Sequence, residues 1–212
     1  MDLLRFYGRN FAELVGLVEQ HLSLVAISTA IALAIGLPLG IVLTRRPAWR
    51  VPVLGLANIF QTIPSLALFG FLIPLPFIGG IGATTAIVAL VFYALLPIVR
   101  NTYEGIASVD PAVREAGRGM GMTDWQLLTQ VELPLGMGVI LAGVRIATVV
   151  SVGTATIAAA IGAGGLGVYI FRGVAVVDDT LILAGALPAA LIALAADGLL
   201  GLAQRRLGWR AR

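Results

Sequence analysis

The longest charge-free stretch of the sequence lies between Arg50 and Arg100, and it constrains the fold more than any other feature. A helix that spans a bilayer needs only ~20 apolar residues, so this stretch is long enough for two such helices. Prolines and glycines mark the loop between them, at Pro74, Pro76, Gly79, Gly80 and Gly82. Composition agrees with a membrane protein: 59% of the residues are hydrophobic, 12% are charged, and the mean hydropathy is +1.00. The expected fold class is therefore all-α and polytopic in the membrane.

About five membrane-spanning helices are expected. Stretches 22–44 and 146–171 also carry no charge, and a last one, 180–202, is interrupted only by Asp197. The expected spans lie near residues 22–44, 51–73, 81–99, 136–161 and 180–203. Residues 1–20 carry charges throughout, which excludes the apolar core of a secretory signal and predicts an amphipathic N-terminal helix at the membrane interface. The domains expected are this helix, a transmembrane domain over 21–207 and a tail over 208–212.

The arginines predict the orientation of the chain, which contains no lysine. Most of them fall in alternate connections or in the C-terminal tail, at Arg45, Arg46, Arg50, Arg100, Arg114, Arg118, Arg205, Arg206, Arg210 and Arg212. Only Arg5, Arg9 and Arg172 fall on the opposite side. By the positive-inside rule the larger group is cytoplasmic. We therefore expect a multi-pass protein of the cell (inner) membrane, in contact with lipid, with its N-terminus outside and its C-terminus in the cytoplasm.

A polar segment separates the third and fourth expected spans. Asp110 and Pro111 predict a helix start there, because aspartate caps free backbone N–H groups and proline is favoured at the first helical position. Thr123 and Gln126 have the spacing of a capping box, which predicts a second short helix after a glycine turn. Pro134 is expected to end that helix, since proline lacks the N–H that a continuing helix requires. An ordinary polar loop between spans is the alternative on these observations alone.

The same segment, 101–135, resembles the EAA loop of the permease subunits of bacterial ABC importers. That family has Glu-Ala-Ala, three residues, glycine, nine residues and Ile-x-Leu-Pro; the matching residues are Glu115, Ala116, Gly117, Gly121, Val131, Leu133 and Pro134. Glycine at 117 in place of alanine and valine at 131 in place of isoleucine are the two departures. In that family the loop forms coupling helices that dock into a cleft of the ATPase subunit. The resemblance implies this role for the matching residues and for their neighbours Met122 and Trp125.

A finer resemblance extends from about residue 21 to 207. The stretches 56–67, 114–122, 153–157 and 161–167 are similar to permeases that import glycine betaine, choline, carnitine and related osmoprotectants. The resemblance implies alternating access with ABC ATPase subunits, a second permease copy or a sister permease, and a separate substrate-binding protein. A chain without lysine has no phosphate-binding loop of the usual kind, so ATP and Mg are expected on the ATPase subunit. This chain is therefore expected to be a permease subunit and not an enzyme. An importer of the same type for methionine or another small nitrogenous solute is the alternative.

Uncharged polar residues in two of the spans are candidates for the translocation path. In the second span they recur at spacings that place them on one helix face: Asn58, Gln61, Thr62 and Ser65. In the fourth span they recur at intervals of three: Thr148, Ser151 and Thr154. A polar face in lipid must turn inward, so both faces are expected to line the passage. For the fourth span the alternative is that small hydroxyl residues only permit close helix packing.

Two charged residues lie inside expected spans, Arg145 and Asp197, at similar depth on the cytoplasmic side. Isolated charges at that depth are costly, so we expect the two side chains to form an ion pair. Snorkelling of one of them toward the cytoplasm is the alternative. A structural clamp is favoured over a proton relay.

Other readings of the sequence find less support. Gly162, Gly164 and Gly167 satisfy G-x-G-x-x-G, yet they follow a membrane span and no acidic residue follows at the expected ~20-residue distance, so a close-packed outer turn is expected instead. His21 is interpreted as an interfacial residue. With no cysteine and one histidine, no metal site is expected, and the net charge of +3 reflects topology and not nucleic-acid binding. An ion-coupled carrier or channel has no use for an EAA loop, and an intramembrane enzyme would need a catalytic set.

Overall fold

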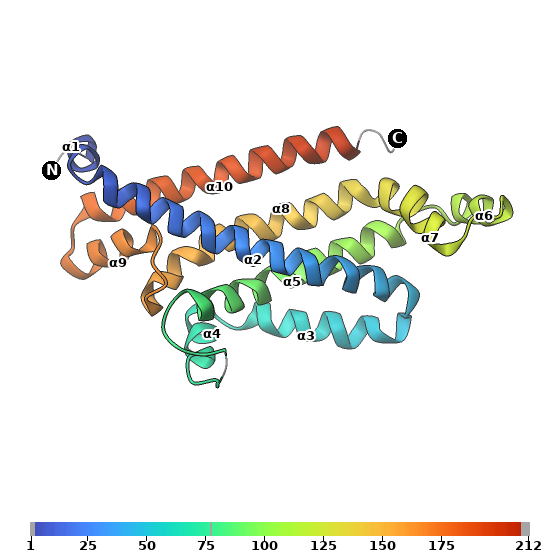
Figure 1. The fold of residues 1–212 in the computed structure, drawn as a ribbon, viewed down its shortest axis with the longest axis horizontal. Coiled ribbons are helices and arrows are strands. Elements are labelled where there is room, and N and C mark those ends of the chain that lie inside the picture. Colours follow the sequence, from blue (N-terminus) through green and yellow to red (C-terminus); the bar gives the residue numbers. More distant parts are fainter. Residues whose placement is uncertain (1–2, 77, 209–212) are drawn as a thin grey trace.

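Long helices lying side by side make up the computed structural model, which describes residues 3–76 and 78–208 (Figure 1). The long helices are α2 (Phe11–Arg45), α5 (Ala83–Ala107), α8 (Leu133–Ile157) and α10 (Asp179–Gly208). Among the described residues, four helical segments are long and apolar enough to cross a membrane: α2, α5, α10 and the continuous helix Asp124–Ile161 that contains α8. A bent pair of helices brings the number to five if the pair counts as one span, in agreement with the number expected from the sequence.

The second span is broken and not continuous. A short 3-10 helix (Pro47–Trp49) leads into α3 (Arg50–Thr62), and α4 (Ser65–Leu72) follows at an angle of 103° to the preceding helix. Ile63 and Pro64 adopt extended backbone conformations between the two helices. Because proline disfavours a helical conformation in the residue before it and lacks an N–H, the helix stops at Thr62. The span expected near 51–73 therefore consists of two helices and not of one.

The loop predicted around the prolines and glycines of the long apolar stretch is present. Gly79 N–H donates to the Leu75 carbonyl at 2.8 Å, and Gly80 N–H donates to the Ile73 carbonyl at 2.9 Å. A Cβ atom on Gly79 would lie 2.3 Å from the Ile73 carbonyl oxygen, so only glycine fits there. The loop connects α4 to α5, and its residue 77 lies outside the described residues.

The N-terminal segment divides at a different point from the one expected. A short helix, α1, covers Leu3–Arg9, and α2 begins at Phe11 and continues without interruption to Arg45. The sequence predicted a separate helix over 1–20, but no proline separates 11–20 from the first apolar stretch. Since extending an existing helix costs less than nucleating a new one, those residues become the first turns of α2. Residues 1–2 and 209–212 lie outside the described residues.

A hydrogen bond from α1 replaces one that a proline removes from α10. Proline has no N–H to donate to the carbonyl four residues earlier, so Pro188 in α10 frees the carbonyl of Ala184. The Tyr7 hydroxyl of α1 donates to that carbonyl at 3.4 Å. In membranes such freed backbone groups are usually satisfied by adjacent helices. The bond from Tyr7 therefore attaches α1 to α10.

The core of the bundle forms around α5. It is the most buried of the long helices and packs against α2, α3, α4 and α8. It approaches α8 closely, since a Cβ atom on Gly136 would lie 2.8 Å from backbone atoms of Gly105. Small residues of this kind let helix backbones come together in membranes. The outermost helix, α10, exposes a row of leucines: Leu183, Leu187, Leu191, Leu194, Leu199 and Leu202.

The two ends of the molecule differ in character. Short helices α6 (Pro111–Gly119) and α7 (Asp124–Leu127) project at one end, where the last described turns of α10 also lie (Figure 1). Helices α1 and α9 (Gly167–Val176) lie at the other end, next to the N-terminus (Figure 1). The first and last described residues therefore lie at opposite ends of the bundle, in agreement with an odd number of passes.

Candidate functional site

The polar segment between α5 and α8 folds as its sequence predicts. The Asp110 carboxylate accepts a hydrogen bond from Ala112 N–H at 2.8 Å and starts α6, with Pro111 in its first turn. The Thr123 hydroxyl accepts from Gln126 N–H at 3.2 Å, and the Gln126 side chain accepts from Thr123 N–H at 2.8 Å. This reciprocal capping box starts α7. Two short helices joined by a glycine turn are therefore confirmed.

Gly121 makes the turn between them possible. It has a φ of +84°, a conformation that residues with a side chain rarely adopt. Its N–H donates to the Arg118 carbonyl at 2.9 Å, and Met122 N–H donates to the Gly117 carbonyl at 3.1 Å. These two bonds form a Schellman motif, which closes the C-terminus of α6. A side chain at this position would strain the turn that sets the angle between α6 and α7.

The predicted coupling residues differ in what they contact. Gly117 is buried, and a Cβ atom there would meet the ends of the Leu127 and Met122 side chains at 2.8 and 3.1 Å. Trp125 is 72% exposed and Met120 is 77% exposed. The remaining predicted residues are either exposed, at Glu115, Ala116, Gly121 and Pro134, or half-buried, at Met122 and Leu133. Large apolar side chains exposed on a polar segment are typical of a docking surface.

Pro134 does not end a helix, contrary to the prediction from the sequence. A π-helical turn over Leu128–Glu132 joins α7 directly to α8, and Leu133 N–H donates to the carbonyl of Leu128, five residues earlier. Proline is tolerated in the first turn of an α-helix. Because the π turn changes the bonding pattern just before Leu133, Pro134 occupies such a first-turn position inside a continuous helical path.

A buried charge cluster that was not predicted from the sequence lies beside the π turn. The Glu132 carboxylate is fully buried and accepts two hydrogen bonds from the Arg45 guanidinium, one through Nη1 at 3.2 Å and one through Nη2. Arg114 Nε lies 3.3 Å from Glu132 Oε1. Arg114 also donates to the carbonyl of Ile106 in the last turns of α5. An acidic residue directly before an apolar helix was the available signal, but its partners are distant in the sequence.

Gln61 contacts α5 at the break in the second span. Pro97 leaves the carbonyl of Tyr93 without its helical N–H donor, and Gln61 Nε2 donates to that carbonyl at 3.1 Å. The Tyr93 hydroxyl in turn donates to the carbonyl of Ile63, at the break itself. Gln61 therefore makes a structural hydrogen bond to α5. Tyr93, which the sequence analysis did not single out, holds the break against α5.

The other polar residues of this span lie on both sides of the break. Asn58 and Thr62 belong to α3 and are exposed on the single chain, whereas Ser65 begins α4 and is half-buried. The Thr62 hydroxyl donates within its own helix, to Ile59 at 2.7 Å. The expectation of one shared helix face is wrong, because the 103° bend separates Ser65 from the rest. Asn58 and Thr62 remain candidates for the path.

The three hydroxyl residues of α8 are not equivalent. Ser151 is fully buried inside the chain, so it packs between helices and does not face a passage in this conformation. Thr148 and Thr154 are half-buried, and the Thr148 hydroxyl donates to the carbonyl of Val144 at 2.9 Å. The alternative that small hydroxyl residues only permit close helix packing therefore applies to Ser151. Thr148 and Thr154 remain candidates for the translocation path.

Arg145 and Asp197 form the ion pair that their similar depth predicts. Arg145 Nε and Nη2 donate to the two carboxylate oxygens of Asp197 at 2.5 and 2.6 Å. The side chains are 38% and 40% exposed on the single chain. They line a hollow of about 370 Å³ between α8 and α10, together with Gln204. A charged pair at membrane depth on the surface of one chain is expected to face protein or water and not lipid.

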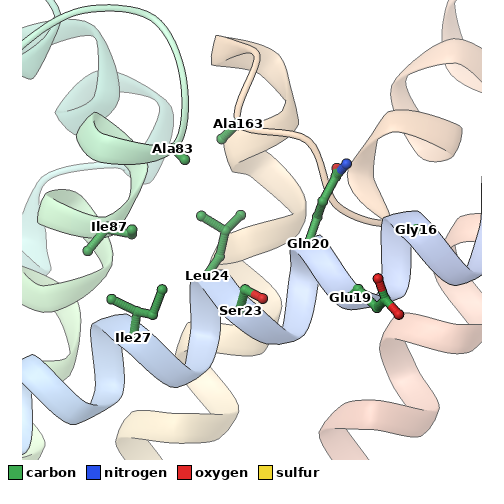
Figure 2. Close-up of a pocket in the computed structure, with 9 residues that line it drawn as sticks. All are labelled: Gly16, Glu19, Gln20, Ser23, Leu24, Ile27, Ala83, Ile87 and Ala163. Atoms are coloured by element: carbon green, nitrogen blue, oxygen red, sulfur yellow. The ribbon is translucent and has the colours of Figure 1, made fainter.

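The end of the bundle near the N-terminus holds a second hollow, of about 410 Å³ (Figure 2). Its walls come from α2, the start of α5 and the turn that follows the 3-10 helix Ala158–Ile161. Glu19, Gln20 and Ser23 give it a carboxylate, an amide and a hydroxyl, and the remaining lining is mostly apolar: Gly16, Leu24, Ile27, Ala83, Ile87 and Ala163. Such a lining suits a small cation, a zwitterion or a side chain of a docked protein.

The glycine-rich segment that contains the dinucleotide-like motif forms a tight turn at this end. Gly162, Gly164 and Gly165 have φ values of +72°, +80° and +78°. Gly165 N–H donates to the Gln20 side chain at 3.0 Å, which attaches the turn to α2. His21, interpreted from the sequence as interfacial, is instead fully buried in the chain against Gly165. Its neighbours from the turn cover it, and nothing near His21 in the sequence indicates that long-range contact.

Comparison with known proteins agrees with these features. The family model described as "Binding-protein-dependent transport system inner membrane component" matches residues 36–209. The osmoprotectant import permease protein OsmW of Salmonella typhimurium is 47% identical over 202 residues, which cover 94% of each chain. The carnitine transport permease protein OpuCB of Listeria monocytogenes is 43% identical over 205 residues, covering 97% of this chain and 93% of that protein.

Solved structures share the fold. An inward-facing crystal structure of the MetNI methionine ABC transporter matches with a TM-score of 0.84 and 25% identity, covering 94% of this chain and 98% of that one. A crystal structure of an amino acid ABC transporter matches with a TM-score of 0.79 and 21% identity, covering 97% and 99% of the two chains. With the family model covering most of its length, the chain belongs to the binding-protein-dependent inner membrane components, the permease subunits of ABC importers.

Proposed function

We propose that this permease imports osmoprotectants of the glycine betaine, choline and carnitine class. One observation carries the proposal: relatives named for osmoprotectant, carnitine, choline and glycine betaine transport are 41–47% identical over at least 94% of the chain. Uncharged polar groups such as those of Asn58 and Thr62 suit a zwitterion or cation that must pass without being held tightly. The solute would be delivered by a separate substrate-binding protein.

The end that carries α6 and α7 is proposed to be cytoplasmic. The arginine distribution supports this orientation, since it places most arginines at that end and the N-terminus outside. The exposed side chains of Met120 and Trp125 would then meet the ATPase subunits, which would bind ATP and Mg. ATP-driven closure of the ATPase subunits would move α6 and α7 and switch the spans between outward-open and inward-open states. The binding protein would dock at the opposite end, near the glycine turn.

Two permease subunits are proposed to enclose the path, either two copies of this chain or this chain with a sister permease. The half-exposed ion pair of Arg145 and Asp197 supports this assembly, because a second subunit or a water-filled passage would shield it from lipid. The exposed polar side chains of Asn58 and Thr62 have the same requirement. Within the complex, the ion pair would act as a clamp between α8 and α10.

A second candidate substrate is methionine. The fold similarity to the MetNI methionine transporter, with a TM-score of 0.84, favours it, although the identity of 25% is well below that of the osmoprotectant relatives. The two candidates differ in solute chemistry, since methionine carries a primary amine and the osmoprotectants carry a quaternary ammonium group. Direct uptake measurements therefore separate them.

The test is uptake of labelled glycine betaine, choline, carnitine and methionine at high osmolarity, in cells with and without the gene. The cells should lack their other importers for these solutes. Uptake restored by the wild type but not by Gly121→Asp, which strains the turn between α6 and α7, would support both the substrate class and the coupling segment. Uptake of methionine alone would replace the substrate assignment, and restoration by the Gly121 variant would refute the coupling role.

Orientation has its own test, which the absence of cysteine makes simple. A single cysteine at Trp125 or at Gly119, both exposed in the coupling segment, can be treated in intact spheroplasts with a membrane-impermeant maleimide. We expect no labelling until the membrane is opened. A cysteine at Val177, exposed at the other end, should react at once. The reverse pattern would overturn the proposed topology.

A further inference from the structure

The buried cluster of Glu132, Arg45 and Arg114 joins the coupling segment to three long helices. Arg45 is in the last turn of α2, Arg114 lies in α6, and Glu132 closes the π turn that leads into α8. Arg114 also donates to the Ile106 carbonyl, near the end of α5. The Glu132 carboxylate thus connects α6 and α8 to α2, although Arg45 and Glu132 are 87 residues apart in the sequence.

The chemistry of the cluster makes it a stiff connection. The Glu132 side chain is fully buried, whereas the side chains of Arg45 and Arg114 are 35% and 25% exposed. Charge-assisted bonds of a guanidinium fork to a carboxylate are strong and directional, and exclusion of water strengthens them further. By contrast, the i,i+4 pair of Arg100 and Glu104 is exposed on both sides and is expected to contribute little.

The π turn explains why Glu132 points into the cluster. Such a turn inserts one extra residue into a helix, which rotates the following side chains by about 100° relative to a regular α-helix. π turns are rare and are often found at functional sites. Here the turn lies between α7, which carries the exposed Trp125, and the first turn of α8. The turn thus directs the Glu132 carboxylate toward α2 and α6.

We infer that Glu132 is a positioning residue that transmits movement of the coupling helices to the first span. Arg114 directly precedes Glu115 on α6, so a displacement of α6 by an ATPase subunit moves the Arg114 guanidinium and with it Glu132. The bidentate bond to Arg45 passes that displacement to the end of α2. Helix α6 and the end of α2 then move as one body. This inference rests on the proposed coupling role of α6 and α7.

The first test measures the number of solute molecules transported per ATP hydrolysed, using the whole importer complex in proteoliposomes with labelled glycine betaine. Glu132→Gln is expected to keep ATP hydrolysis and to lower this ratio roughly tenfold, within the usual range of coupling between sites. Arg45→Lys, which retains charge but loses the fork, should fall between the wild type and Glu132→Gln. The matched control Glu104→Gln breaks the exposed pair and should leave the ratio unchanged.

If Glu132→Gln fails to assemble, Arg45→Gln decides, because that side chain is partly exposed and its loss leaves Arg114 on the carboxylate. An unchanged ratio in a variant that assembles, or equal losses of hydrolysis and transport, would overturn the inference. If the wild type does not transport glycine betaine, choline or carnitine, the substrate assignment fails. The second experiment, which needs no transported solute, then tests the coupling inference alone.

The second test needs no transported solute. Spin labels on cysteines introduced at Ala48 and Gly119, both exposed and in a chain without native cysteine, report the distance between the end of α2 and α6. In the wild-type complex this distance should stay the same when a non-hydrolysable ATP analogue binds, because the two elements move together. In Glu132→Gln it should change. A wild-type distance that changes with nucleotide as much as that of the variant would refute the linkage.

Discussion

Replacing Gln61 by leucine tests whether a side-chain amide substitutes for the helical N–H that Pro97 lacks. Gln61 Nε2 donates to the Tyr93 carbonyl at 3.1 Å, and leucine would remove this donor at similar volume. Leaving a buried carbonyl unsatisfied costs roughly 1–3 kcal/mol. Hydrogen bonds between membrane helices contribute less, about 0.6 kcal/mol on average with a maximum near 1.7. We therefore expect a loss of about 1 kcal/mol.

The assay is the apparent melting temperature of the purified complex in detergent, measured in two backgrounds. For a chain of this size, 1 kcal/mol corresponds to about 2–4 °C, so Gln61→Leu should lower Tm by that amount. In a Pro97→Ala background the alanine N–H can bond to the Tyr93 carbonyl, and Gln61→Leu should then lower Tm by less than about 1 °C. Interaction energies of this kind are what a double-mutant cycle isolates.

Equal decreases in both backgrounds would refute the reasoning, since the amide would then act independently of the proline. Thr62→Val is the matched control: Thr62 lies next to Gln61, but its hydroxyl donates within α3, to the carbonyl of Ile59. It should leave Tm unchanged in both backgrounds. A Gln61→Leu variant with normal Tm and impaired uptake would instead assign Gln61 to the path.

Three further substitutions test other contacts. Gly136→Ala would place a methyl group 2.8 Å from the facing backbone of α5 and should lower Tm by an amount that corresponds to roughly 1–3 kcal/mol. The control is Gly153→Ala on the same helix, whose methyl group would have no atom within 4 Å and should leave Tm the same or higher. Asp197→Asn and Arg145→Ala should each reduce the amount of assembled complex on a gel, because each leaves a polar partner unpaired at membrane depth; normal assembly of the first with loss of the second would refute the clamp. Trp125→Ala should leave Tm of the chain unchanged but reduce co-purification of the ATPase, and undiminished co-purification would place the docking surface elsewhere.

Features set by neighbouring residues were predictable from the sequence. The cap at Asp110 and the capping box of Thr123 and Gln126 depend on side chains that bond two or three residues away, so their spacing alone identifies them. The ion pair of Arg145 and Asp197 could be predicted from the sequence for a different reason. In a membrane span, two isolated charges at the same depth have few other partners.

Features that depend on distant contacts were not predictable. Nothing near Glu132 in the sequence indicates that Arg45 lies beside it, and a π turn has no simple sequence pattern. The break at Pro64 was visible as a proline, but a proline in a span can produce either a mild kink or a full interruption. The contact of Gln61 with α5 stabilises the interruption here, and the burial of His21 likewise depends on a turn far along the chain.

Two of the carbonyls that lose a helical donor to a proline also bear on how such a chain can change over evolutionary time. Tyr7 and Pro188 are separated by most of the sequence, and Gln61 and Pro97 lie on different helices, yet each pair shares one backbone acceptor. A substitution that restores an N–H at either proline removes the requirement for its donor, and loss of the donor favours loss of the proline. Related permeases are therefore expected to change these positions in pairs, and a second-site suppressor of Gln61→Leu should map to Pro97.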